Sequence, residues 1–271
     1  AQGQTARANS ASVALASYAA IDAQRLAAKA GIDADLRAQA PARDTRTADA
    51  RLKSLGHYQG AMIHYGGEWY WGLDRLHYLE ARLTEIGARR DSAPGEPIFA
   101  PPVTLENTGQ TTAVLNWYLS FRSPYTAIVA ERVEALAKAY GAELRLRFVL
   151  PMVMRALPVP PSKRRYIVMD TAREAHRLGV PFGRVSDPVG APVERGYAIL
   201  HWAMEHECGL DFAKAFLRSV WSEGVDAGSD RGLKRIAEAA GLNWAEARAQ
   251  INTQGWRNVA EADRAEMMSY G

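Results

Sequence analysis

A strand, a helix and a second strand follow one another closely between residues 113 and 150. The stretch AVLNWYLSF (residues 113–121) predicts the first strand, and AELRLRFVL (residues 142–150) predicts the second. Residues 124–140 between them carry apolar side chains at helical spacing, namely Ile128, Val129, Val133, Leu136 and Tyr140. Two strands joined by a helical crossover lie parallel in one sheet. The chain is therefore predicted to contain an α/β domain.

Ser123 and Pro124 stand where the first strand ends and the helix begins. Serine is a favoured N-cap and proline is favoured in the first helical turn, so on local grounds a structural cap is the commoner role. The same position has a second use, because a hydroxyl beside unpaired backbone N–H groups and the positive end of a helix dipole can donate to a thiolate and lower its pKa. Both roles of Ser123 stay open at this point.

Before this unit the predicted order is helix, helix, hairpin, helix. Residues 12–30 and a short segment after them have helical spacing of apolar side chains. Residues 60–72 place aromatic and β-branched side chains on both sides of Gly66 and Gly67, which predicts a two-stranded hairpin with a tight turn. Residues 73–87 predict the next helix, and every convincing segment after the second strand of the βαβ unit is also helical.

An internal repeat indicates how these parts are related. The stretch LAAKAGIDADLRAQA from Leu26 resembles IAEAAGLNWAEARAQ from Ile236, at an offset of about 210 residues, the size of one domain. Residues 90–112 hold four prolines and two glycines without periodicity, as a linker does. We therefore expect residues 1–89 to be the C-terminal part of one domain copy, and residues 113–271 to be the βαβ unit and helical insertion of a second.

Composition excludes several classes of protein. The single cysteine, Cys208, rules out an internal disulfide and a Cys-x-x-Cys pair, and with them dithiol oxidoreductase chemistry within this chain. The 33 basic and 30 acidic residues nearly cancel, so we expect no nucleic-acid partner. We find neither an apolar stretch of membrane-spanning length nor a secretory leader before the first helix, and expect a cytoplasmic protein without a membrane partner. His201 and His206 are five residues apart, which does not align them on one helical face, so no metal site is predicted.

Three stretches of the second half resemble a known family. LSFRSPYTAI (residues 119–128), FVLP (148–151) and PSKRRYIVMDTAREAHRLGVPF (161–182) are similar to the opening βαβ unit and first inserted helix of 2-hydroxychromene-2-carboxylate isomerases and kappa-class glutathione transferases. In the first half, GGEWYWGLDRLHYLEARL (66–83) is similar to the family's closing strand and helix, where a Trp-Gly-x-Asp-Arg-Leu pattern is typical. The resemblance implies that both copies have a DsbA-like thioredoxin fold, which is an α/β fold with a large helical insertion.

The resemblance implies a glutathione site built from four residues. Ser123 stands where a redox cysteine would stand and would hold the glutathione thiolate. Lys163 would contact glutathione or a substrate carboxylate, Asp74 would face the γ-glutamyl amine, and Tyr125 would complete the site. Two of these residues also have plain structural roles, since Lys163 could be a solvated residue at a helix start and Asp74 could cap its helix.

The function implied by the resemblance is a glutathione-dependent isomerase of the 2-hydroxychromene-2-carboxylate isomerase type. Its substrate would be a small electrophilic molecule, aromatic or conjugated, and the protein would act as a homodimer or with its tandem copies packed together. A kappa-class-like glutathione transferase is one alternative. A non-catalytic thioredoxin-fold module that binds a partner is another.

The hairpin of the first half differs from the family pattern and could still serve the second half. The family usually has a cis-proline where this chain has Ala61; because a non-proline cis bond costs ~3 kcal/mol, we expect the peptide bond at Ala61 to be trans. An exposed sheet edge is a liability. We therefore hypothesise that residues 58–84 pack against the βαβ unit and complete one four-stranded sheet, with residues 90–112 as the connection.

Overall fold

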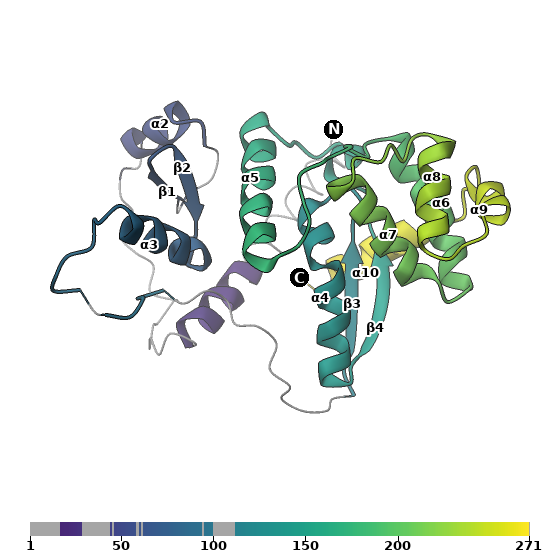
Figure 1. Cartoon of the computed structure of the whole chain (residues 1–271), viewed down its shortest axis with the longest axis horizontal. Helices are drawn as coiled ribbons and strands as arrows, with labels where there is room; N and C mark the ends of the chain where they lie inside the picture. Colours follow the sequence, from purple (N-terminus) through teal and green to yellow (C-terminus); the bar gives the residue numbers. More distant parts are fainter. Residues whose placement is uncertain are drawn as a thin grey trace.

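The strands and the helix of the βαβ unit occur where the sequence predicts them. In the computed structural model, β3 (Val114–Leu119) and β4 (Glu143–Phe148) pair in parallel, with Val114 opposite Glu143 and Leu119 opposite Phe148. α4 (Pro124–Tyr140) connects the two strands and packs against both (Figure 1). The predicted α/β fold is confirmed.

The structure describes residues 17–28, 44, 46–57, 60, 62–93, 95–99 and 112–270. Ala61 and most of the first copy of the internal repeat lie outside these ranges, so the predictions made for them stay predictions. Of the helices within the ranges, none combines the length and the apolar character that a membrane crossing needs.

The first half of the chain holds a hairpin between short helices. Residues 17–28 form a helix, which is followed by α2 (Arg46–Ser54), β1 (Met62–Tyr65), β2 (Glu68–Trp71), the 3-10 turn η1 (Leu73–Arg75) and α3 (Leu76–Glu85). Gly66 and Gly67 join β1 to β2 with φ of 55° and 82°, the positive values that a two-residue type I′ turn requires. The predicted hairpin is confirmed, and residues 62–85 are called the hairpin unit below.

Beyond β4, the regular structure up to residue 270 is helical. It consists of the 3-10 turn η2 (Met152–Arg155), α5 (Pro161–Leu178), α6 (Ala191–Glu205), α7 (Gly209–Ser222), α8 (Asp230–Ala239), α9 (Trp244–Gln250) and α10 (Trp256–Ser269). The second copy of the internal repeat is the end of α8, the turn at Gly241 and α9. The predicted large helical insertion is confirmed.

The core lies between this helical region and the β3–β4 pair. Phe121, just after β3, is fully buried, and its ring centroid lies 3.9 Å from that of Phe216 and 4.9 Å from that of Tyr197. At the end of β4, the backbone N–H of Phe148 donates to Asp263 of α10 at 2.9 Å. Helices α6, α7 and α10 therefore hold the carboxyl ends of both strands, next to the start of α4.

The hairpin unit does not extend the β3–β4 sheet. Within the described ranges β1 pairs with β2 and β3 with β4, and the two pairs form separate sheets, so the predicted four-stranded sheet is wrong. Figure 1 places α5 between the hairpin unit and the β3–β4 pair. Polar side chains of α5 contact the hairpin unit instead.

Part of the predicted linker is tied to the hairpin unit. The carboxylate of Glu80 on α3 accepts the backbone N–H groups of Ile98 and Phe99, each at 2.7 Å. These bonds hold residues 98 and 99 against α3 and lower the pKa of Glu80. Residues 100–111 lie outside the described ranges, and the division into two domain copies stays a prediction.

Candidate functional site

Ser123 is the N-cap of α4, as the sequence predicts. Its backbone is extended, with φ of −99° and ψ of 114°, and its Oγ accepts the N–H of Thr126 at 3.2 Å. The Ser123 carbonyl accepts the N–H of Ala127 at 3.2 Å, and Pro124 occupies the first helical turn. These bonds satisfy two of the N–H groups that a helix start leaves unpaired.

Two donors remain at the start of α4. The hydroxyl proton of Ser123 and the backbone N–H of Tyr125 have no acceptor in the part of the chain that the structure describes. Both lie at the positive end of a helix of 17 residues, where the dipole favours an anion. The position can therefore cap the helix and also donate to an external anion.

The turn that carries Ser123 is fixed by the helical region. The N–H of Ser123 donates to the Ser120 carbonyl at 2.9 Å, and the indole N–H of Trp221 donates to the Phe121 carbonyl at 3.0 Å. The phenol of Tyr197 accepts the Phe121 N–H at 3.3 Å and donates to the Val149 carbonyl at 2.7 Å. Buried polar side chains thus satisfy the backbone of the turn and hold it at the ends of β3 and β4.

Tyr125 points its hydroxyl at a buried carboxylate on α5. The phenol donates to Oδ2 of Asp170 at 2.7 Å, and Asp170 is only 2% exposed. Arg75 of the hairpin unit donates to the same carboxylate, from Nε at 3.0 Å and from Nη2 at 3.0 Å. Burial and the neighbouring Asp170 charge raise the pKa of Tyr125, so the phenol keeps its proton and acts as a donor.

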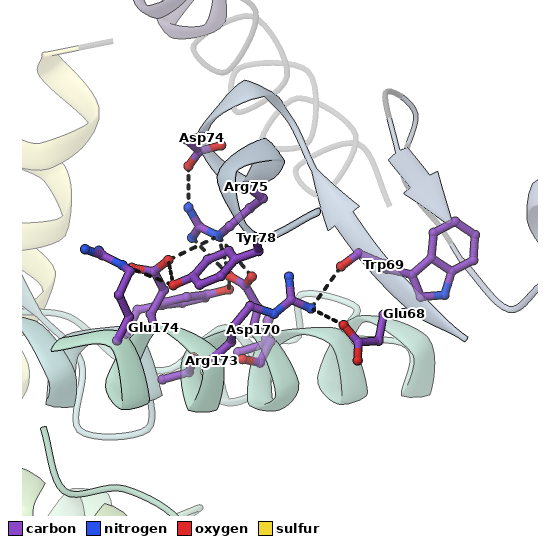
Figure 2. Close-up of polar contacts among 12 residues, drawn as sticks. Glu68, Trp69, Asp74, Arg75, Tyr78, Asp170, Arg173 and Glu174 are labelled. Atoms are coloured by element: carbon purple, nitrogen blue, oxygen red, sulfur yellow. Dashed lines mark hydrogen bonds and ion pairs between the residues drawn. The ribbon is translucent and has the colours of Figure 1, made fainter. Parts of the chain in front are cut away.

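The contacts around Arg75 extend along α5 (Figure 2). Glu174 accepts the Tyr78 hydroxyl at 2.7 Å and lies 3.7 Å from Nε of Arg75. Arg173 donates to the Trp69 carbonyl at 3.2 Å and lies over the rings of Tyr70 and Tyr78, 4.7 and 5.2 Å from their centroids. We call this set the docking cluster; its members are Arg75, Tyr78, Asp170, Arg173 and Glu174.

The four residues predicted for the glutathione site are only partly brought together. Ser123 and Tyr125 share the start of α4. Asp74 has a side chain that is 54% exposed and pairs with Arg75 at 2.5 Å, so it is linked to Tyr125 only through Arg75 and Asp170. Lys163 lies in the first turn of α5, and no hydrogen bond or ion pair connects it with the other three within the described ranges.

The residues that the sequence prediction missed are Asp170 and Arg75. An acidic residue within a helix is exposed in most proteins, and Asp170 stands within an otherwise ordinary helical pattern. The available signal was its spacing of four residues from Glu174, which puts two carboxylates on one face of α5. Arg75 directly follows Asp74 in the Trp-Gly-x-Asp-Arg-Leu pattern, so the pattern marked the segment that contains it.

A large cavity lies elsewhere, between the hairpin unit and α5. Its volume is about 780 Å³, and its wall includes Trp69, Tyr70, Tyr166 and Arg173. Asp170 also lines it, whereas Ser123 and Tyr125 do not. The start of α4 is thus half-buried beside the docking cluster and does not line this cavity.

The docking of the hairpin unit is expected to weaken in acid. Burial alone would raise the pKa of Glu174, but hydrogen bonds from Tyr78 and Arg177 and the charges of Arg75 and Arg177 lower it on balance. A carboxyl whose pKa is lower in the folded state stabilises that state above its ordinary pKa of 4.5, and the stabilisation is lost as pH falls through the lowered value. We expect acid to undock the hairpin unit. Tryptophan fluorescence, to which Trp69 and Trp71 contribute, would measure this change.

A Glu174→Gln variant provides the control for this pH dependence. The amide keeps the shape of the side chain but cannot ionise, so its docking should be weaker at neutral pH and should change less on acidification. If the fluorescence of the wild type and of Glu174→Gln followed pH identically, Glu174 would not be the group that titrates.

The match to a protein family agrees with this architecture. The model of the DSBA-like thioredoxin domain matches residues 114–271. Among solved structures, 2-hydroxychromene-2-carboxylate isomerase is 15% identical over 57% of this chain and 78% of that chain, with a TM-score of 0.48. A probable DsbA oxidoreductase from Streptomyces coelicolor is 19% identical over 58% of this chain and 75% of that chain, with a TM-score of 0.45. No curated protein sequence matches the chain. With a family match that covers more than half of its residues, the chain belongs to the DsbA-like thioredoxin domain family.

Proposed function

We propose that the protein is a glutathione-dependent isomerase of the 2-hydroxychromene-2-carboxylate isomerase type. The observation that carries the proposal is the pair of donors left at the start of α4, the Ser123 hydroxyl and the Tyr125 N–H. Both belong to the start of α4 at the positive end of the helix, where a bound thiolate would accept both. Ser123 would then act as a hydrogen-bond donor and not as a nucleophile.

The chemistry of these residues fits a glutathione thiolate. Donors and a helix N-terminus favour the thiolate over the thiol and so lower the thiol pKa. When bound, glutathione supplies a sulfur nucleophile that adds to a conjugated substrate and leaves after the substrate has changed configuration. The residues of this chain would hold that sulfur and orient it. Asp74, whose exposed carboxylate also pairs with Arg75, and Lys163 would contact the charged ends of the tripeptide.

Sequence and structure favour this thiol chemistry over dithiol exchange. Ser123 occupies the helix start at which a nucleophilic cysteine would be activated, and the single cysteine, Cys208, lies at the start of α7 instead. Disulfide exchange within one chain needs two cysteines at the same site. A thiol that arrives with a small molecule removes this requirement.

A non-catalytic binding module is the second candidate. It is favoured by the position of the 780 Å³ cavity, which is formed by the hairpin unit and α5 and is not lined by Ser123. A kappa-class-like transferase would share the Ser123 site and differ only in releasing the conjugate, so product analysis separates it from the isomerase. Binding of glutathione at Ser123 separates both enzymes from the module.

Replacing Ser123 tests the proposal, and three variants separate the donor from the cap. A hydrogen bond to a charged group contributes about 1.5–3 kcal/mol, so Ser123→Ala is expected to raise the thiol pKa of bound glutathione by about 1–2. Ser123→Thr keeps both the donor and the cap and should leave the pKa nearly unchanged. Ser123→Asp keeps a good cap but places a negative charge beside the sulfur, and should abolish thiolate formation.

The measurement is a titration of glutathione into each protein, followed by the ultraviolet absorbance of the thiolate. Loss of the cap alone would affect Ser123→Ala through stability, which thermal unfolding records separately. Equal thiolate stabilisation by wild type, Ser123→Ala and Ser123→Asp would remove Ser123 from the mechanism. No thiolate with the wild type would favour the binding module.

A further inference from the structure

We infer that Arg75, although it belongs to the hairpin unit, is a positioning residue for the start of α4, and that it acts through Asp170 and Tyr125. The identity of the bound ligand rests on the proposed function, whereas the contacts among Arg75, Asp170 and Tyr125 do not depend on it. Through Arg75 the hairpin unit would support the Ser123 site, even though the unit adds no strand to the β3–β4 sheet.

Asp170 is the point at which three elements meet. It lies on α5 and is 2% exposed, and its two oxygens accept three bonds from the Arg75 guanidinium and one from the Tyr125 phenol. A carboxylate can accept about four hydrogen bonds, and a buried one needs such partners to stay ionised. Arg75 supplies the positive charge, with a side chain that is itself 16% exposed.

Tyr125 links the Arg75–Asp170 pair to the start of α4. It is the second residue of α4, so its ring and its free backbone N–H belong to the same helical turn as the Ser123 cap. A phenol bonded to an ionised carboxylate is held more strongly than one bonded to a neutral acid. The Tyr125 ring is fixed against α5, and this anchors the turn that carries both the Tyr125 N–H and the Ser123 hydroxyl.

Loss of Arg75 should therefore destabilise the first turn of α4. Asp170 would be left buried without the guanidinium that it contacts, and the unpaired carboxylate would draw in water or move toward solvent. Its bond to Tyr125 would then weaken. The first turn of α4 would then lose its anchor on α5 while keeping its own cap bonds between Ser123 and Thr126.

The experiment compares hydrogen–deuterium exchange in peptides covering residues 118–128, without any ligand. The amides of Thr126 and Ala127 are bonded to Ser123 and report on the turn. Arg75→Met and Tyr125→Phe each remove one step of the connection, and each is expected to speed exchange of these amides about tenfold, the effect of losing one charge-assisted bond. Arg82→Met is the matched control, since Arg82 contacts Glu68 and the Gly66 carbonyl within the hairpin unit but not Asp170.

Tyr125→Phe keeps the inference testable if Arg75→Met undocks the hairpin unit altogether, because it leaves the Arg75–Asp170 pair intact. Faster exchange of the turn in both variants and not in Arg82→Met would support the inference. Unchanged exchange in residues 118–128, with or without faster exchange in residues 62–85, would overturn it. The thiol pKa of bound glutathione, raised in the same two variants, gives the second readout. If the wild type bound no glutathione, the proposed function would fail while the exchange result still decided the role of Arg75.

Discussion

Replacing Phe121 by alanine is expected to lower the free energy of unfolding by about 3–5 kcal/mol. The ring is fully buried and lies against the rings of Phe216, Tyr197 and Phe212, with centroids 3.9, 4.9 and 6.3 Å away. Alanine removes these contacts and leaves a cavity that the stacked rings cannot fill without leaving their own positions. Chemical denaturation followed by tryptophan fluorescence measures the loss.

The same variant should also weaken the site, since Phe121 is two residues before Ser123 and its backbone is held by Tyr197 and Trp221. Ile98→Ala serves as the control, because Ile98 is 65% exposed and its removal should change the stability by about 0.5 kcal/mol or less. A loss below about 1 kcal/mol for Phe121→Ala would contradict the packing described for this turn.

The parts of the fold that the sequence predicted are those that depend on neighbouring residues. The helix between the two parallel strands was placed at residues 124–140, where α4 lies, because its cap, its apolar spacing and its terminal glycine all act locally. The hairpin followed from Gly66 and Gly67, which supply the positive φ of its turn. Local signals also placed Ser123 at the helix start.

The docking of the hairpin unit depends on pairs of residues far apart in the chain. Arg75 and Asp170 are 95 positions apart, and neither differs in pattern from a solvated charge on a helix. The four-stranded sheet was predicted from the principle that an edge strand seeks a partner. That principle does not say which surface covers the edge, and here the hairpin unit contacts polar side chains of α5 and pairs with neither β3 nor β4. The connection between Asp74 and Tyr125 passes through Arg75 and Asp170, and it could not be predicted because these two residues are far apart in the chain.

The second large effect is expected at the Arg75–Asp170 pair. Removing one partner of a buried ion pair costs about 3–5 kcal/mol, because the other charge stays buried without compensation. Arg75→Met should therefore lower the free energy of docking by an amount of this size, and should increase exchange and proteolysis in residues 62–85. Asp170 is nearly fully buried and Arg75 largely so, which keeps solvent from screening the pair.

A cycle of variants separates the strength of the pair from the cost of breaking it. Replacing a whole buried ionic group by apolar residues of similar volume is often neutral, whereas removing half of it is not. Arg75→Met combined with Asp170→Leu and Tyr125→Phe leaves no unpaired polar group among these three side chains, so the triple variant should dock more tightly than Arg75→Met alone. Arg82→Met changes an exposed contact and should leave docking almost unaffected. If the triple variant docked as poorly as Arg75→Met, the ion pair itself, and not an uncompensated carboxylate, would hold the hairpin unit on α5.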